Sequence, residues 1–167
     1  MTNRAIFNRQ YTSYTPGGTE VWLVNGAGVT TTPVTTQSFT AGENLIQGQA
    51  VYVSGTYALS ASAASGVAAA RYNVIGFTNA AASSSATVTV VVDDIVLISS
   101  ANIAGATQLT PGAYYYLSKY TGQITPYSTA SGTVTASGGY AALVNVGQAL
   151  STSELQVEIE PPVVLYD

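Results

Sequence analysis

One short pattern occurs twice in this sequence, and it constrains the fold more than any other feature. LIQGQAVYVS at Leu45–Ser54 returns as LTPGAYYYLS at Leu109–Ser118. The two segments carry a leucine, a glycine, a tyrosine and a serine at the same positions. Gln49–Ser54 alternates in the manner of a strand, and Ala113–Lys119 reads as a tyrosine-rich strand. A strand pattern repeated over this length predicts two copies of one small β unit.

The match continues downstream of both segments. NVIGF at Asn73–Phe77 corresponds to LVNVG at Leu143–Gly147, and ATVTVVVDDIVLI at Ala86–Ile98 corresponds to ELQVEIEPPVVL at Glu154–Leu165. The offset between matched positions changes from one piece to the next, so the loops differ in length while the strand-like pieces keep their order. We therefore predict a β domain over 41–167, with repeat one at about 41–100 and repeat two at about 105–167.

Short strands separated by turn residues run through both repeats. Thr87–Val92 alternates, with Val88 and Val90 directed inward, and Glu154–Glu160 alternates in the same way. Gly76, inside a predicted strand, indicates a bulge or a close backbone approach. Many short strands with frequent turns predict an all-β sandwich or small barrel with very low helix content.

Residues 1–40 differ from the rest of the chain. They contain two of the four basic residues and one acid, Glu20, so their net charge is +1 while that of 41–167 is −5. One strand is predicted, at Glu20–Asn25, and Gly26-Ala27-Gly28 is interpreted as a turn. We interpret 1–40 as an extended N-terminal arm that docks on another surface. The alternative is a disordered tail, against which the aromatic content weighs. The candidate docking residues are Arg4, Phe7, Arg9, Tyr11, Tyr14 and Trp22.

Charged residues are scarce: they make up 7% of the 167 residues, and the net charge is −4. Ordinary soluble domains carry about 25%. A neutral, hydroxyl-rich surface suits permanent contact with other subunits, although an ordinary soluble β sandwich is the alternative. Four cations cannot neutralise a phosphate track, so no nucleic-acid partner is predicted. No apolar run reaches the ~20 residues that a membrane span needs, so no membrane association is predicted.

The side chains that carry most catalysis are missing. The sequence has no His and no Cys, which removes the conventional triad, a thiolate nucleophile and a zinc site. Asp93-Asp94, at a strand end, is interpreted as a turn, with a weak Ca²⁺ site as the alternative. Glu154, Glu158 and Glu160 are expected to form a solvated edge, or alternatively a surface that binds a cation. We predict that the chain is not an enzyme and has no catalytic residue, metal site or cofactor.

Tyrosines are common, with 12 in the chain. Aromatic rings are enriched at interfaces and also stack on sugars, and the alternative is that they fill a β core. In Tyr114-Tyr115-Tyr116 neighbouring rings point to opposite faces of a strand. We assign Tyr115 to the core and Tyr114, Tyr116 and Tyr120 to an interface, although the two faces could be exchanged.

The repeated line AGENLIQGQAVYVSG…NVIGFTNAAASSSATVTVVVDDIVLI resembles a β module common in virion proteins of tailed bacteriophages. The module's recurring form is an acidic-Asn/Ala-Leu opening, G-x-x-V-Y, a short hairpin, V/A-I-G-hydrophobic, a small-residue loop and an alternating Val/Thr strand. It is similar to that of capsid decoration (cement) proteins, and related stretches occur in tail-fibre and head-fibre chains. The resemblance covers about Ala41 to Leu165, counting both copies.

The resemblance implies a structural virion protein, made in the host cytoplasm and carried on the outer capsid surface. Decoration proteins of this kind are oligomers, usually trimers, that clamp neighbouring capsid subunits against internal genome pressure. The expected partners are therefore the major capsid protein and other copies of this chain in a homotrimer. The alternative is a short tail-fibre, head-fibre or baseplate protein that binds a host-surface glycan through its tyrosines. The tandem repeat departs from the commoner single-module decoration protein.

Overall fold

The chain is built from strands and separates into two compact units. The computed structural model describes residues 20–24, 27–31, 35–127 and 139–165. The units are Met1–Thr35 and Thr36–Asp167. Across the described residues the fold is all-β, with two short 3-10 helices, so the predicted fold class is confirmed.

The first unit contains one antiparallel hairpin, β1 (Glu20–Val24) and β2 (Ala27–Thr31). The strand predicted at Glu20–Asn25 is β1. The turn interpretation of Gly26-Ala27-Gly28 is wrong for Ala27 and Gly28, which belong to β2, and Gly26 lies outside the described residues. Val24 pairs with Ala27, and Asn25-Gly26 stands between them in the sequence. This dipeptide is the strongest short-range hairpin signal, and it could have identified β2.

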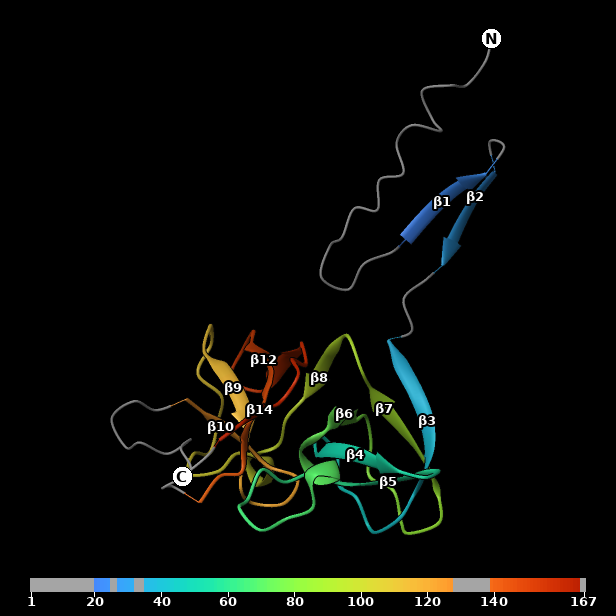
Figure 1. The fold of residues 1–167 in the computed structure, drawn as a ribbon. Coiled ribbons are helices and arrows are strands. Elements are labelled where there is room, and N and C mark those ends of the chain that lie inside the picture. Colours follow the sequence, from blue (N-terminus) through green and yellow to red (C-terminus); the bar gives the residue numbers. More distant parts are fainter. Residues whose placement is uncertain (1–19, 25–26, 32–34, 128–138, 166–167) are drawn as a thin grey trace. The chain divides into compact units, whose positions relative to one another are not determined.

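The first half of the second unit is a closed five-stranded barrel (Figure 1). Its strands are β3 (Thr36–Ala41), β4 (Ala50–Ser54), β5 (Tyr57–Ser60), β6 (Val74–Thr78) and β7 (Thr87–Val91), and the 3-10 helix η1 (Ala69–Tyr72) precedes β6. They run in the order β3-β5-β4-β6-β7. Neighbouring strands are antiparallel except β3 and β5, whose parallel pairing closes the barrel.

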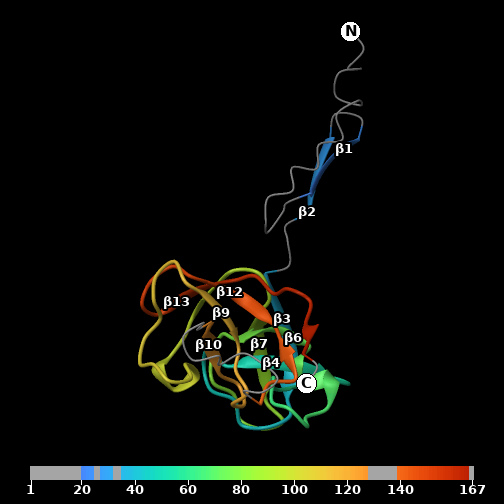
Figure 2. The ribbon, with the colours of Figure 1, turned by 60° about the vertical axis from the view of Figure 1, so that its left-hand side comes forward.

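The second half contains a five-stranded antiparallel sheet (Figure 2). Its strands are β8 (Ile95–Leu97), β9 (Tyr114–Leu117), β10 (Ile124–Pro126), β12 (Asn145–Ala149) and β13 (Glu154–Val157), and the 3-10 helix η2 (Ser100–Asn102) follows β8. Their order is β10-β9-β12-β13-β8. A separate two-stranded ribbon pairs β11 (Ala142–Leu143) with β14 (Val163–Val164).

The two halves have the same topology. β3 to β7 correspond in order and pairing to β8, β9, β10, β12 and β13, and in both halves the first strand lies antiparallel to the last. The barrel is closed by two parallel pairs between β3 and β5, and the sheet has one parallel bridge in the same place, Ile103 with Ile124. The internal repeat seen in the sequence is therefore a repeat of the fold.

The strands divide between the repeats at different points from those predicted. Thr36–Thr40, assigned above to the arm, lies in β3 and pairs with β7. Ile95–Leu97, assigned above to the end of repeat one, forms β8 and pairs with β13 of repeat two. The sequence did not indicate the positions of these two strands, because β3 lacks apolar alternation and β8 continues an apolar run that begins in β7. The repeats are therefore 36–91 and 95–165 by strand pairing.

Two matched glycines lie at matched bulges. The register between β4 and β6 shifts beside Gly76, and that between β9 and β12 shifts beside Gly147. A Cβ at Gly76 would overlap the carbonyl oxygen of Val91, and one at Gly147 would overlap that of Gln156. The bulge or close approach predicted at Gly76 is confirmed, and it is repeated in the second half.

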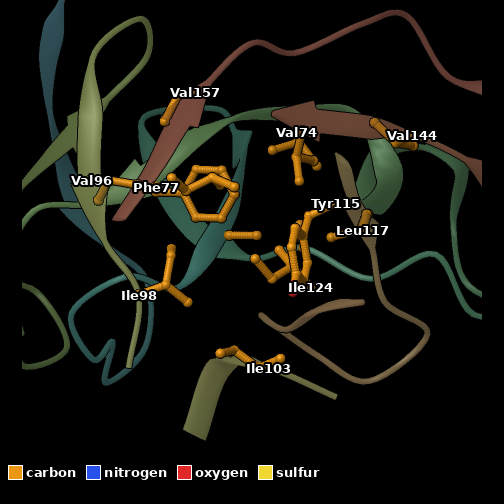
Figure 3. Close-up of a cluster of buried hydrophobic side chains, with 14 of the residues drawn as sticks. Val74, Phe77, Val96, Ile98, Ile103, Tyr115, Leu117, Ile124, Val144 and Val157 are labelled. Carbon is orange, nitrogen blue, oxygen red and sulfur yellow. The ribbon is translucent and has the colours of Figure 1, made fainter. Parts of the chain in front are cut away.

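Two clusters of buried side chains hold the second unit together. The smaller cluster fills the closed barrel: Ala41, Leu45, Val51, Ala58, Val88 and Val90. The larger one joins the repeats, because Phe77 and Val74 of repeat one lie among Val96, Tyr115 and Ile124 of repeat two (Figure 3). The outer face of the first barrel thus forms one wall of the second core.

Backbone hydrogen bonds connect the repeats as well. Gly122 N–H donates to the carbonyl of Ala61, and Ala50 N–H donates to the carbonyl of Gly122, at 2.7 and 3.0 Å. The Asn102 side-chain amide donates to the Gln47 carbonyl at 2.6 Å. The described residues between 36 and 165 therefore form one folded body rather than two repeats that fold independently.

Candidate interface

The predicted docking residues of the arm are mostly outside the described part of the chain. Arg4, Phe7, Arg9, Tyr11 and Tyr14 precede residue 20. Trp22 lies in β1, where its backbone is paired with Val29 of β2. Their proposed docking role stays a prediction.

The three consecutive tyrosines of β9 divide between two faces, as predicted. Tyr115 is buried, and its hydroxyl accepts a hydrogen bond from the Thr110 N–H at 2.9 Å. Tyr114 and Tyr116 both lie on the face of β9 opposite to Tyr115. Tyr114 is 50% exposed, and Tyr116 is half-buried. The Tyr116 ring lies 5.6 Å from that of Tyr127, which is itself 50% exposed. Tyr127 is an exposed aromatic residue that the sequence analysis did not select.

Tyr120 lies in the turn between β9 and β10 and is 57% exposed. The Lys119 ammonium is 5.7 Å from the centre of its ring and 5.8 Å from that of the buried Tyr140. A cation at this range of an aromatic face is attracted to it. Tyr120 thus belongs to a second aromatic group, built around Lys119, rather than to the Tyr116–Tyr127 pair.

β8 presents two apolar side chains to solvent. Ile95 is 48% exposed and Leu97 is 51% exposed, while Val96 between them is buried. Gln156 of β13 is directly opposite Ile95, and Glu154 is opposite Leu97. We call this surface, formed by Ile95, Leu97, Glu154 and Gln156, the β8 face. The exposure of Ile95 and Leu97 was not predicted, because the run Ile95–Ile98 is apolar throughout and does not indicate which side of the strand faces solvent.

The acidic residues are the candidate ligands for a cation. Within the part of the chain that the structure describes, no three acidic side chains gather where they could hold a metal ion. The Asp94 carboxylate accepts a hydrogen bond from the N–H of the next residue, Ile95, at 2.7 Å, and Asp93-Asp94 lies in the bend between β7 and β8. Glu158 and Glu160 are exposed, and Glu154 is half-buried.

A shallow hollow of about 440 Å³ lies beside β3. Its lining offers hydroxyl groups and one aromatic ring, without a carboxylate or a cation: Ser38, Phe39, Thr40, Gly55, Thr56 and Thr87. A hydroxyl needs a neighbouring base to become a nucleophile. This hollow therefore has the chemistry of a surface groove and lacks that of a reaction centre.

Among the described residues, no helix has the length and apolar character needed to cross a membrane. Neither a protein-family model nor a curated protein matches the sequence. The surface of the second unit is therefore the main guide to function.

Proposed function

We propose that this chain is a non-catalytic structural protein that decorates the outer capsid surface of a tailed bacteriophage and bridges neighbouring capsid subunits. The observation that carries the proposal is the outer surface of repeat two. It exposes Ile95, Leu97, Tyr114 and Tyr127 by about half each, in a chain with 7% charged residues. Apolar and aromatic surface with few charges is typical of protein–protein interfaces. The sequence resemblance to decoration modules points the same way.

In this proposal the body covers the shell as a homotrimer and the N-terminal arm adds contacts beyond the body. The partners are the major capsid protein and other copies of the chain. The tandem repeat would present a closed barrel and a related five-stranded sheet in each chain. The protein is made in the host cytoplasm and functions in the virion.

The proposal is tested first by the copy number of the chain relative to the major capsid protein in purified particles, measured by quantitative mass spectrometry. A copy number comparable to that of the capsid protein is expected. A few copies per particle would contradict decoration of the whole shell and would favour a tail or head-fibre position.

The contribution of the arm is tested by deletion. Removing residues 1–35 leaves β3 whole, whereas a deletion through Thr40 would take most of β3 out of the barrel. We expect the shortened chain to retain its cooperative unfolding transition and to lose binding to particles stripped of the protein. Full binding by the shortened chain would contradict a role for the arm.

The second candidate function is host-glycan binding by a short tail-fibre, head-fibre or baseplate protein. The ring pair Tyr116–Tyr127, in which Tyr127 is 50% exposed, favours it, because exposed aromatic faces can stack on sugars. Saturable binding to a glycan array, lost in Tyr114→Ala and Tyr116→Ala, would support this function. Absence of binding across the array would leave decoration as the better proposal.

A further inference from the structure

The β8 face exposes apolar side chains at positions where the fold does not need them. In repeat one, Thr36 of β3 is opposite Val91 and Ser38 is opposite Thr89. In repeat two, Ile95 and Leu97 of β8 occupy the corresponding places, opposite Gln156 and Glu154. All four of these β3 and β8 residues are exposed. The same architecture thus accepts small polar residues here, and the isoleucine and leucine of repeat two require another explanation.

Acidic residues surround the β8 face. The unit Thr36–Asp167 has seven acids, and five of them lie within two residues before β8 or on β13 and the three residues after it: Asp93, Asp94, Glu154, Glu158 and Glu160. The pairing of β8 with β13 brings these two groups together, and the Val157 N–H donates to the Asp94 carbonyl at 2.9 Å. The β8 face is therefore an apolar strip with negative charge at its margins.

The chain contains one segment with the complementary pattern. Met1–Gln10 reads MTNRAIFNRQ, in which Arg4 and Arg9 flank Ile6 and Phe7. The two other cations of the chain are Arg71 and Lys119. Arg71 lies in η1 of repeat one, and Lys119 lies over the rings of Tyr120 and Tyr140. The N-terminal segment thus combines apolar side chains with half of the positive charge of the chain.

We propose that the β8 face binds the N-terminal segment Arg4–Arg9 of a second copy of this chain. Neighbouring side chains of an extended segment point to opposite sides, so Phe7 covers Ile95 and Leu97 while Ile6 faces away, and the long arginine side chains reach the acids at the margins. In extended form the segment spans about 17 Å between its arginines, at ~3.3 Å per residue. The three residues of β8 span about 7 Å, so the arginines extend past both ends of the strip, where the acids lie.

This inference rests on the proposed function, in which many copies lie side by side on one shell. The N-terminal segment of one copy is then close to the β8 face of the next, so we choose a second copy as the occupant. An arm that ends on a neighbouring copy links the decorating proteins to one another as well as to the capsid. Charge pairing around an apolar centre also sets the register of the contact, since a shifted register would place an arginine on the apolar strip and leave it without an acid. The two observations are independent: one is an exposed strip, the other a sequence pattern elsewhere in the chain.

The experiment uses the full-length protein in solution, without particles, at concentrations that favour association. A photo-crosslinking amino acid replaces Phe7, and equal amounts of ¹⁵N-labelled and unlabelled protein are mixed. Mass spectrometry then locates the crosslinked peptides. We expect crosslinks from position 7 to the peptide around Ile95–Leu97 in which one partner is labelled and the other is not. Crosslinks confined to one isotope would show docking within a single chain and would overturn the proposal, as would crosslinks to another surface.

Two variants identify the contact. The double substitution Ile95→Thr and Leu97→Ser installs a threonine and a serine, as found at the matched positions of β3, and should reduce the mixed-isotope crosslink about tenfold or more, because each buried apolar side chain contributes to binding. The control, Val163→Thr with Val164→Thr, changes exposed apolar residues of β14, which are 59% and 42% exposed, and should leave the crosslink unchanged. Equal loss in both variants would overturn the assignment to the β8 face.

Exchanging the charges of the two proposed partners tests whether a lost crosslink is caused by misfolding. Arg4→Glu with Arg9→Glu should abolish the crosslink, and a mixture of this variant with Asp94→Lys, Glu154→Lys protein should restore it. Failure to restore would overturn the pairing. The result is separable from that of the copy-number measurement. Neighbour linking in solution with few copies per virion would refute shell decoration alone, and abundant copies without linking would refute this inference alone.

Discussion

The two repeats share one strand order but differ in what covers their outer faces. In repeat one, Ala50, Phe77 and Val91 are buried against repeat two. By strand pairing, their counterparts in repeat two are Tyr114, Gln148 and Gln156, which are half-buried or exposed. The backbone topology is the same in both repeats. Small or apolar side chains occupy these positions in repeat one, where the other repeat covers them, and tyrosine and glutamine occupy them in repeat two, where it does not. Side chains on this face therefore report what the face contacts.

The largest expected effect comes from the matched pair Phe77 and Gln148. Phe77 is fully buried between the repeats, so Phe77→Ala should lower the free energy of unfolding by about 3–5 kcal/mol. Gln148 donates one hydrogen bond, to the Gly112 carbonyl at 2.9 Å in an exposed setting, so Gln148→Ala should cost about 1 kcal/mol or less. Chemical denaturation of both variants measures the difference. Similar losses would mean that repeat two also packs its outer face against something within the chain.

The next effect tests the matched bulges. Gly76→Ala and Gly147→Ala each place a methyl group against a backbone carbonyl of the neighbouring strand, and backbone cannot yield as a side chain can. We expect each to lower the free energy of unfolding by about 1–3 kcal/mol. Gly147 should lose more, because its φ of +144° is also unfavourable for a residue with a side chain.

Gly55→Ala is the control for the backbone term. Gly55 has φ of +63°, and a Cβ there meets nothing within 4 Å. It should therefore show the cost of positive φ without the overlap, about 1 kcal/mol. Thermal and chemical unfolding of the three variants separates the two causes. A Gly76→Ala protein as stable as the parent would contradict the close approach that the repeats share.

Much of the correspondence between the repeats can be predicted from the sequence, because the matched residues include glycines whose backbone conformation or close packing only glycine allows. Gly48 and Gly112 both adopt positive φ, +74° and +81°, and Gly76 and Gly147 both lie at bulges, so matching letters mark matching geometry. The inward residues Val88 and Val90 follow from alternation. β3 does not, because its sequence TQSFTA shows no apolar period and its pairing with β7 is set by tertiary structure.

The candidate site was harder to predict than the fold. The assignment of Tyr115 to the core and of Tyr114 to the surface follows from alternation along one strand. The exposure of Ile95, Leu97 and Tyr127 does not, because apolar residues in a strand are normally expected inside. What distinguishes them is that, among the described residues, no element covers this face of repeat two, a property of the assembled fold that local sequence does not encode.

A smaller effect concerns a polar contact that repeat one has and repeat two lacks. Thr78 is buried, and its hydroxyl accepts a hydrogen bond from the Gln49 N–H at 2.9 Å and donates one to the Ile46 carbonyl. The matched residue of repeat two is Ala149. Thr78→Val keeps the shape and leaves both groups without this partner, so we expect a loss of about 1–2 kcal/mol. Unfolding in urea measures it, and no loss would show that water or a rearranged loop replaces the hydroxyl.

The smallest effect on stability is expected on the open face of repeat two. Tyr127→Ala removes the ring 5.6 Å from that of Tyr116, a contact of the kind that contributes about 0.5–1.5 kcal/mol when well packed. Tyr127 is 50% exposed, so the loss should lie near the lower limit of that range. In repeat one the tyrosine matched to Tyr116 is Tyr52, which packs against the larger core cluster, and Tyr52→Ala should therefore cost more than Tyr127→Ala. Binding to stripped particles should respond in the opposite order, falling for Tyr127→Ala and staying unchanged for folded Tyr52→Ala. If both variants lose stability equally and neither affects binding, the open face is part of the fold of repeat two and not a surface for a partner.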